Sequence, residues 1–477
     1  MQLGSDYRRV VVGADAPSKG SAATVAVERF ESVFFWVLLA SLATMAVPFA
    51  GAHLWSWGLA AILIGLSLLG YALVLIFTEA RLAVPMRRML LPLLLISIPV
   101  LWTFAQMMPL GRSDLAHPIW AAAGEVLKRP IPERISVDPW ATGSAVIRLL
   151  LYIGIFFLAV QLCRSVERAF LALNVLVAFA AAYGLYGLVA YALMPDHLLW
   201  LAHPSHRGDL SPTPVDGSSY ATFAALGLIA SIALLAKLVH RPAVSSASRG
   251  SLLAHLPRIA GVRASAPAVA IIVLAAAILL THPQGGLATG ISVVVLLLCL
   301  ITVTRLSRVA RIVLVSLVVV GIVLVVRLAD QAILGFREAT GGQQTALYAL
   351  VRQGIADSPL LGHGYGAFES AFQSYGDGTI DGYSVTANNG YLEIVFDLGL
   401  PAACLLVLAI AAVGARCLAG VYIRRRDIAY PALGVAAATL AGAQTLTDVS
   451  IQAPAVAALL AFILGLGYSQ SWTSSDT

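Results

Sequence analysis

The sequence is dominated by long runs of apolar residues separated by short polar segments. A helix needs about 17–25 predominantly apolar residues to cross the hydrocarbon core of a bilayer, and we count twelve such runs, two of them short. They lie near residues 32–50, 54–77, 89–107, 144–163, 170–194, 219–239, 267–281, 287–303, 310–327, 391–413, 428–445 and 453–469. Only 11% of the residues are charged, against about 25% in soluble domains. The sequence therefore predicts an all-α integral membrane protein of about twelve spans and excludes a water-soluble enzyme.

The placement of Lys and Arg gives these spans an orientation. With the N-terminus inside, the short inner segments hold more than two thirds of the 30 Lys and Arg residues, as the positive-inside rule requires. The net charge of +6 is thus explained by membrane topology, and no nucleic-acid partner is expected. The chain is expected to comprise a cytoplasmic tail over 1–31, a membrane domain over 32–469 and a second cytoplasmic tail over 470–477.

Three long segments fall on the outer face: residues 108–143, 195–218 and 328–390. Binding and chemistry concentrate in the long connections of a rigid scaffold. The 328–390 loop, between spans nine and ten, is predicted to be partly helical because apolar residues recur at helical spacing over 343–358. The Ser358-Pro359 pair then ends that helix.

Two motifs follow the helix of this loop. The three glycines of Leu360-Leu-Gly-His-Gly-Tyr-Gly366 permit tight turns, and such a run can point successive N–H groups at phosphate oxygens. Further on, Asn388 or Asn389 can cap the helix of the tenth span. Glu393 and Asp397 are four residues apart and share one face of that helix. These carboxylates either face a polar cavity or lie at headgroup level beside the positive helix N-terminus.

The residues of these motifs are similar to those of a known family. The stretch Asp357-Ser-Pro-Leu-Leu-Gly-His-Gly-Tyr-Gly-Ala-Phe368, followed by Asn389-Gly-Tyr-Leu-Glu393 and Leu398-Gly-Leu-Pro401, resembles the O-antigen ligase/polymerase superfamily. The resemblance implies a metal-independent glycosyltransferase in the bacterial inner membrane that needs no cofactor. Its donor would be a saccharide on undecaprenyl pyrophosphate at the periplasmic face. Its acceptor would be another lipid-linked glycan or lipid A–core.

The site residues of the family carry over only in part. The resemblance implies arginines that clamp the pyrophosphate, and Arg207 lies where one of them is expected. The family's histidine aligns with Asn388, whose amide can position a hydroxyl but cannot remove its proton. A Ser-Arg pair of the family is replaced by Pro283-Gln284, and a further family arginine aligns with Gln343 or Gln344. Either the base and part of the anion clamp come from other residues, which we favour, or the protein binds lipid-linked glycan without turning it over.

Local residues supply candidates for both roles. His363 or Glu393 can act as the base, and Asn388 occupies the position of the family's histidine. The candidate ligands of the pyrophosphate and the glycan are Arg207, Arg352, Arg337, Arg148, Gln284, Asn389 and Tyr391. Arginine suits this role because its guanidinium forms paired, charge-assisted bonds with phosphate oxygens. Arg148 lies inside the fourth span, from where it can bind the lipid phosphate or extend to the outer interface.

The four cysteines show no Cys-x-x-Cys or Cys/His spacing, so no metal site is expected. We favour a polymerase that joins repeat units of a surface polysaccharide or exopolysaccharide, because the ligase-like histidine and arginines are the features that this chain lacks. The alternatives are a ligase that transfers glycan to lipid A–core, a membrane transporter, and a non-catalytic component of polysaccharide assembly. The expected partners are the lipid-linked glycan, membrane lipid, and the chain-length regulator and flippase of such a pathway.

Overall fold

The structure is a computed structural model of the 477-residue chain. It describes residues 19–46, 54–110, 114–193, 197–198, 201–202, 217–239, 260–281, 290–296, 344–376, 386–424 and 426–472. Three predicted site residues, Arg207, Gln284 and Arg337, lie outside the described residues, and so does the whole predicted span at 310–327.

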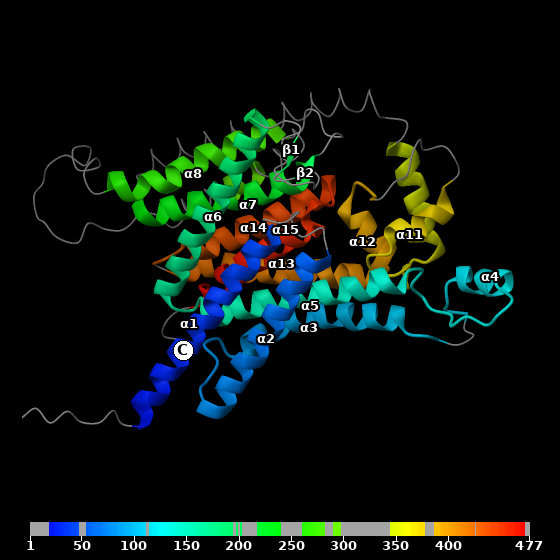
Figure 1. The fold of residues 1–477 in the computed structure, drawn as a ribbon, viewed down its shortest axis with the longest axis horizontal. Coiled ribbons are helices and arrows are strands. Elements are labelled where there is room, and N and C mark those ends of the chain that lie inside the picture. Colours follow the sequence, from blue (N-terminus) through cyan, green and yellow to red (C-terminus); the bar gives the residue numbers. More distant parts are fainter. Residues whose placement is uncertain are drawn as a thin grey trace, which may run out of the picture.

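The described part of the chain is almost entirely helical (Figure 1). Its helices are α1 (Lys19–Ala46), α2 (Leu54–Thr78), α3 (Met86–Met107), α4 (Pro118–Val126), α5 (Pro139–Leu162), α6 (Val166–Leu193), α7 (Gly217–Val239), α8 (Ala260–Thr281), α11 (Phe368–Phe372), α12 (Gly390–Leu398), α13 (Leu400–Ile423), α14 (Ala429–Thr447) and α15 (Pro454–Ser469). Residues 290–296 and 344–357 are also helical, and η2 (Gln373–Tyr375) and η3 (Ser450–Gln452) are single 3₁₀ turns. The strands β1 (His197–Leu198) and β2 (Leu201–Ala202) form one short antiparallel hairpin.

The prediction of a multi-pass helical membrane protein is confirmed. Seven helices of the described residues are long and apolar enough to cross a bilayer: α1, α2, α3, α5, α6, α7 and α13. Two shorter apolar stretches lie in α8 and α15, at Ala264–Leu280 and Pro454–Ser469. Each of these nine helices overlaps one of the predicted runs, but the total of twelve stays a prediction.

The structure corrects the prediction of one continuous span over 391–413. The helix breaks at Gly399, where φ is +77°, so α12 ends at Leu398 and the membrane-spanning helix α13 begins at Leu400. Only glycine fits this position, because an added Cβ would meet the carbonyl oxygen of Leu360 at 2.3 Å. The N–H of Leu400 donates to the carbonyl of Pro359 at 2.8 Å and fixes the break. Glu393 and Asp397 therefore lie on a short helix outside the span.

The spans pack into one bundle with a continuous apolar core. Helix α5 packs against α3 and α15, and α13 packs against α3 and α14. Helices α4, α11 and α12 lie together at one end of the bundle (Figure 1). A small second core joins the 344–357 helix to α11 and α12 through Val351, Phe368 and Phe396. The predicted helix of the outer loop is thus present, and it ends before Ser358-Pro359 as expected.

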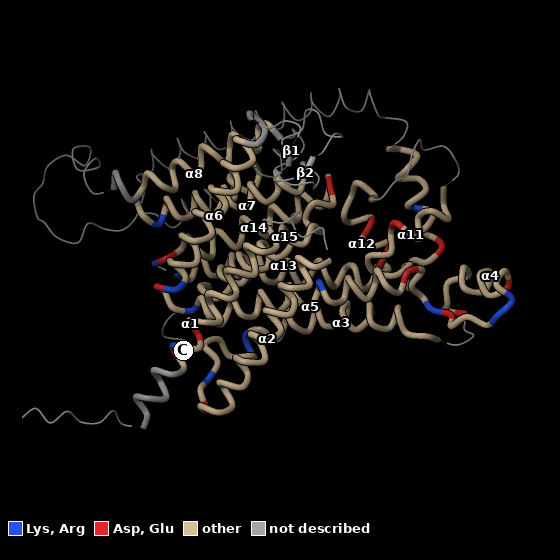
Figure 2. The backbone as a smooth tube through the Cα atoms, viewed as in Figure 1, with Lys and Arg blue, Asp and Glu red and all other residues tan. Residues whose placement is uncertain are grey.

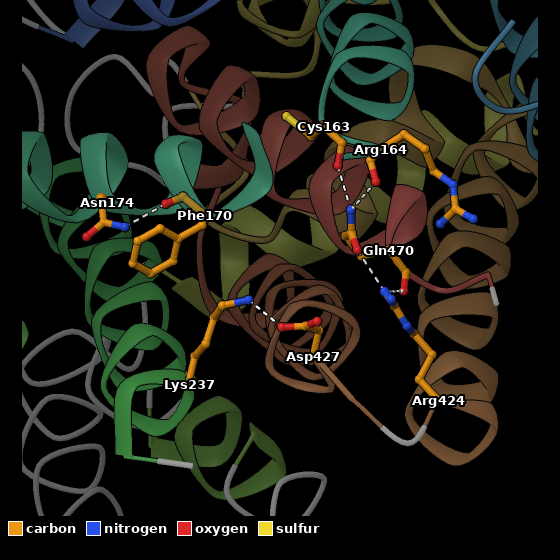
Figure 3. Close-up of polar contacts among 8 residues, drawn as sticks. All are labelled: Cys163, Arg164, Phe170, Asn174, Lys237, Arg424, Asp427 and Gln470. Atoms are coloured by element: carbon orange, nitrogen blue, oxygen red, sulfur yellow. Dashed lines mark hydrogen bonds and ion pairs between the residues drawn. The ribbon is translucent and has the colours of Figure 1, made fainter. Parts of the chain in front are cut away.

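Polar contacts connect the helices at the end of the bundle opposite α4, α11 and α12. Several basic residues lie at that end, whereas acidic residues gather near α11 and α12 (Figure 2). Lys237, in the last turn of α7, forms an ion pair with Asp427 (Figure 3). The Gln470 amide donates to the carbonyls of Cys163 and Arg164 at 2.7 and 2.8 Å and accepts from Arg424. These bonds tie the end of α15 to the α5–α6 turn and to α13.

Candidate functional site

The bundle encloses a cavity of about 350 Å³ between α3, α5, α12, α13, α14 and α15. Most of its wall is apolar, with Leu149, Ile410 and Leu460 among the lining residues. Six of the described lining residues carry polar side chains: Arg148, Tyr152, Tyr365, Tyr391, Thr445 and Gln452. Among the described residues that line the cavity, Arg148 is the only one with a charged side chain. Such a cavity suits an amphipathic ligand with an anionic head.

Helix α5 places Arg148 in this wall. The helix starts five residues earlier than predicted because Pro139 occupies its first turn and Asp138 caps it. The Asp138 carboxylate accepts hydrogen bonds from the N–H groups of Trp140 and Ala141 at 3.1 and 3.0 Å. Arg148 lies more than two turns inside the helix, and its Nε is buried without a hydrogen-bond partner. An unpartnered buried donor is costly, so this nitrogen is available to a ligand oxygen.

The glycine turn approaches α12 and α5 closely. Gly362, Gly364 and Gly366 have φ of +69°, +109° and +79°, which favour glycine. An added Cβ at Gly362 would meet the carbonyl oxygen of Asp397 at 2.2 Å, and one at Gly364 would meet Oγ of Ser136 at 2.4 Å. The predicted close backbone approach is therefore present, although the glycines approach the protein itself.

The expectation that this turn cradles a phosphate is wrong. The N–H groups of residues 363–366 already donate to acceptors within the protein. In chain order, these acceptors are the Phe396 carbonyl, the Asp397 carbonyl, the Gln106 side chain and the Asp397 carboxylate. Gln106 is the main brace: its amide donates to the carbonyls of Leu361 and Asp397 at 2.7 and 2.9 Å. The turn thus acts as a rigid support at the polar end of the cavity.

Asp397 lies between the glycine turn and α5. Its Oδ2 accepts a hydrogen bond from the N–H of Gly366 at 2.7 Å. Its Oδ1 is buried without a partner, and the residue is 2% exposed. Burial raises the pKa of Asp397 well above its usual range, and the neighbouring Glu393 raises it further. Arg148 is close, since an added Cβ at Gly366 would lie 3.6 Å from its Nη2.

Glu393 also faces the interior from α12. Its carboxylate is 7% exposed and accepts a hydrogen bond from the N–H of Ala387 at 2.9 Å. Burial raises the pKa of Glu393 to about 7, whereas the hydrogen bond from Ala387 and the nearby Gln452 side chain oppose this rise. Gln452 itself lines the cavity. Neither Glu393 nor Asp397 is among the described residues that line the cavity, so the prediction that these carboxylates face a polar cavity stays a prediction.

The two asparagines before α12 have different roles. Asn389 is the N-cap, because its Oδ1 accepts from the N–H groups of Tyr391 and Leu392 at 3.1 Å each. Asn388 is exposed in a left-handed conformation with φ of +51°. The Tyr391 ring lines the cavity, and its hydroxyl donates to the carbonyl of Gly442 at 3.0 Å. Tyr391 is therefore the one of these three residues that borders the cavity.

Two other predicted residues lie away from the cavity wall. His363 is 1% exposed, with its ring stacked on Phe396 and its two nitrogens bonded to the Phe396 carbonyl and the Tyr375 hydroxyl. Burial lowers its pKa. Arg352 is exposed on the 344–357 helix, where its Nε donates to the carbonyl of Tyr348 at 3.2 Å. The structure thus places Arg148 and Tyr391 in the cavity wall, whereas Glu393 is not among the described lining residues. The roles of Glu393, His363 and Arg352 stay predictions.

Several polar groups near the cavity were not predicted from the sequence. Gln106, Tyr152, Tyr365 and Gln452 were not singled out, and Asp397 was noted only as the neighbour of Glu393. Tyr152 follows Arg148 by four residues and so shares its helix face, which was a usable signal. Among the described residues, no group of three or more His, Cys, Asp or Glu side chains could hold a metal ion.

The fold defines a multi-pass membrane protein, and its cavity is largely apolar, with Arg148 as the one charged side chain among the described lining residues. Residues 269–407 match the model of a family described as O-antigen ligase. The match spans less than a third of the chain and includes the glycine turn and α12. It confirms the resemblance to the O-antigen ligase/polymerase superfamily and supports a membrane glycan-handling function of that type. No curated protein matches the chain.

Proposed function

We propose that this protein is a glycosyltransferase of the bacterial inner membrane. It would take glycan from undecaprenyl pyrophosphate at the periplasmic face and polymerise the repeat units of a surface polysaccharide or exopolysaccharide. The proposal depends mainly on the cavity, which is apolar along α3, α5 and α13 and has Arg148 at its polar end. A lipid pyrophosphate has the same distribution of polarity, with an anionic head on an apolar chain.

Arg148 would bind the pyrophosphate of the donor. Its unpartnered Nε is buried, and charge attraction is stronger in such a low-dielectric site than in water. The first part of the isoprenoid chain would lie along Leu149, Ile410 and Leu460, with the remainder in the bilayer. The proposed clamp also includes Arg207, Arg337, Arg352 and Gln284, which come from the outer connections of the predicted topology.

Glu393 would act as the general base. Its carboxylate takes the proton of the acceptor hydroxyl while that oxygen bonds to C1 of the donor sugar. The bond from C1 to the pyrophosphate oxygen breaks, and its electron pair leaves with the pyrophosphate, which the arginines stabilise. The pKa of Glu393, raised by burial to about 7, suits proton transfer near neutral pH. Asn389 and Tyr391 would contact the glycan beside the cavity.

The membrane topology is part of the same proposal. Twelve spans over 32–469 would leave the tails at 1–31 and 470–477 in the cytoplasm. The 328–390 loop would lie in the periplasm, beside α4 and α12. Two observations support this orientation: the basic residues at the end of the bundle opposite α12 (Figure 2), and the more than two thirds of all Lys and Arg residues in the predicted inner segments.

A ligase is the second candidate function, because the family that matches residues 269–407 is described by that activity. A ligase would use the same donor site and differ in its acceptor, which would be lipid A–core. The donor chemistry at Arg148 and Glu393 would be unchanged.

Deletion of the gene followed by analysis of lipid-linked glycans tests this proposal. Loss of a polymerase leaves single repeat units on the carrier, whereas loss of a ligase leaves long polymer that is not attached to lipid A–core. Complementation with Arg148→Gln or Glu393→Gln should reproduce the deletion. Arg129→Gln, at an exposed position, should restore the wild-type pattern. Normal glycan in the Arg148→Gln and Glu393→Gln strains would refute the proposed site.

A further inference from the structure

Asp397 has a buried carboxyl oxygen that forms no hydrogen bond within the described part of the chain. Its Oδ2 is held by the N–H of Gly366 at 2.7 Å, so the orientation of the carboxyl group is fixed. Its Oδ1 is buried and has no hydrogen-bond partner in the described part of the chain. Buried polar atoms of native proteins nearly always have a partner, and an exception indicates a function or a missing ligand.

The surroundings of Asp397 contain more than one such atom. Arg148 approaches Asp397 from α5, Tyr365 from the glycine turn, and Glu393 from the preceding turn of α12. Tyr152 lies near Arg148 and Tyr365. The Nε of Arg148 and the hydroxyl of Tyr152 are also buried without a hydrogen-bond partner, and both residues line the cavity together with Gly366. Asp397 is not among the described residues that line the cavity, but its Oδ2 accepts a hydrogen bond from Gly366, which does line it.

The charge state of Asp397 decides what it can do there. Asp397 takes part in neither Arg168–Glu31 nor Lys237–Asp427, and no cation of the described residues forms an ion pair with it. An ionised carboxylate that is buried without an ion pair is strongly disfavoured. Burial and the nearby Glu393 raise the pKa of Asp397 well above its usual range, against the opposing effects of the Gly366 hydrogen bond and of Arg148. A protonated carboxyl group can keep its Oδ2 as the acceptor for Gly366 and use Oδ1–H as a donor.

We propose that Asp397 binds the donor as a neutral acid, with Oδ1–H donating a hydrogen bond to a phosphate oxygen that Arg148 also contacts. This inference rests on the proposed function, because it assigns a further ligand to the same phosphate. The proton stays on Asp397 throughout, so the residue is a binding group and Glu393 remains the base. The Tyr152 hydroxyl, four residues along α5 from Arg148, adds a second neutral donor.

Substitution of Asp397 by asparagine distinguishes a neutral hydrogen-bond donor from an anionic carboxylate. In Asp397→Asn the side-chain oxygen can still accept from Gly366, and the NH₂ group can still donate to the phosphate. A carboxylate that acted as a base or as an anionic partner of Arg148 would not be replaced by an amide. Asp397→Leu removes both the donor and the acceptor at a similar volume.

The test measures binding of a fluorescent polyprenyl phosphate to the full-length protein in nanodiscs. Asp397→Asn should bind within about twofold of the wild type, whereas Asp397→Leu should bind about tenfold more weakly or worse, as expected for loss of a hydrogen bond to a charged group. Arg148→Gln should also weaken binding at least about tenfold, and Arg129→Gln should not change it.

Two results would overturn the inference separately from the proposed function. If Asp397→Asn loses binding while Arg148→Gln also loses binding, the phosphate site stands and Asp397 acts as an anion. If Arg148→Gln binds as the wild type does, the proposed phosphate site itself is refuted. Melting temperature and monodispersity of each variant in detergent show whether it is folded. If Asp397→Leu does not fold, binding by Asp397→Asn and by Arg148→Gln still tests whether Asp397 acts as a neutral donor or as an anion.

Discussion

Substitution of Gln106 by leucine should release the glycine turn from the bundle. The Gln106 side chain is completely buried and makes three hydrogen bonds across the polar end of the cavity. It donates to the carbonyls of Leu361 and Asp397 at 2.7 and 2.9 Å and accepts from the N–H of Tyr365 at 3.1 Å. Leucine is similar in size but makes none of these bonds, so Gln106→Leu isolates their contribution.

The free-energy cost of Gln106→Leu depends on which hydrogen-bond partners of Gln106 are left without a partner. The Asp397 carbonyl keeps the hydrogen bond from Gly364 at 3.0 Å, but the Leu361 carbonyl and the Tyr365 N–H lose the bonds that Gln106 provides. A buried polar group without a partner costs about 1–3 kcal/mol, so the two groups together cost ~2–6 kcal/mol. Local opening of the turn should therefore become easier by at least about 2 kcal/mol, a factor of about 30 in population.

Hydrogen–deuterium exchange of the peptide that contains residues 360–366 measures this opening. In Gln106→Leu the amides of Gly364 and Tyr365 should exchange at least about 30-fold faster than in the wild type, and glycan transfer should decrease. Gln353→Leu, at an exposed position of the 344–357 helix, is the matched control and should leave the rates unchanged. Exchange within about twofold of the wild type would refute the assignment of Gln106 as the brace of the turn.

Three further predictions concern stability and pH. Gly362→Ala should destabilise the protein by about 2 kcal/mol or more, because φ is +69° and the added Cβ would meet the Asp397 backbone. Gly58→Ala is the control, since an added Cβ there meets open space, and it should not lower the melting temperature, which is measured for both variants. Activity should rise with pH through about 7, the pKa of Glu393, since the base must lose its proton, and a falling profile would contradict this role. Lys237→Met, which leaves Asp427 half-buried without its partner, should lower the melting temperature more than an exposed lysine substitution such as Lys128→Met does.

The fold class was predictable from the sequence because a bilayer imposes a local rule. Each span needs enough consecutive apolar residues, and the runs that become α2, α3 and α7 begin and end within a few residues of the observed helices. The glycine turn and the cap at Asn389 were also local features. The break at Gly399 was missed because the apolar run continues through it. Its cause is a contact with Leu360, almost forty residues earlier in the chain.

The site itself depends on contacts between segments that are distant in the sequence. Arg148 and Asp397 are separated by about 250 residues, and only the packing of α5 beside the glycine turn brings them together. The same packing buries His363 against Phe396 and leaves Arg352 in solvent, although both looked equally suitable from the sequence. Hydrophobic runs, glycines and helix caps act over a few residues, so the sequence alone determines them. Burial and the partner of each polar group are properties of the assembled bundle, so only the tertiary structure decides which side chains form the site.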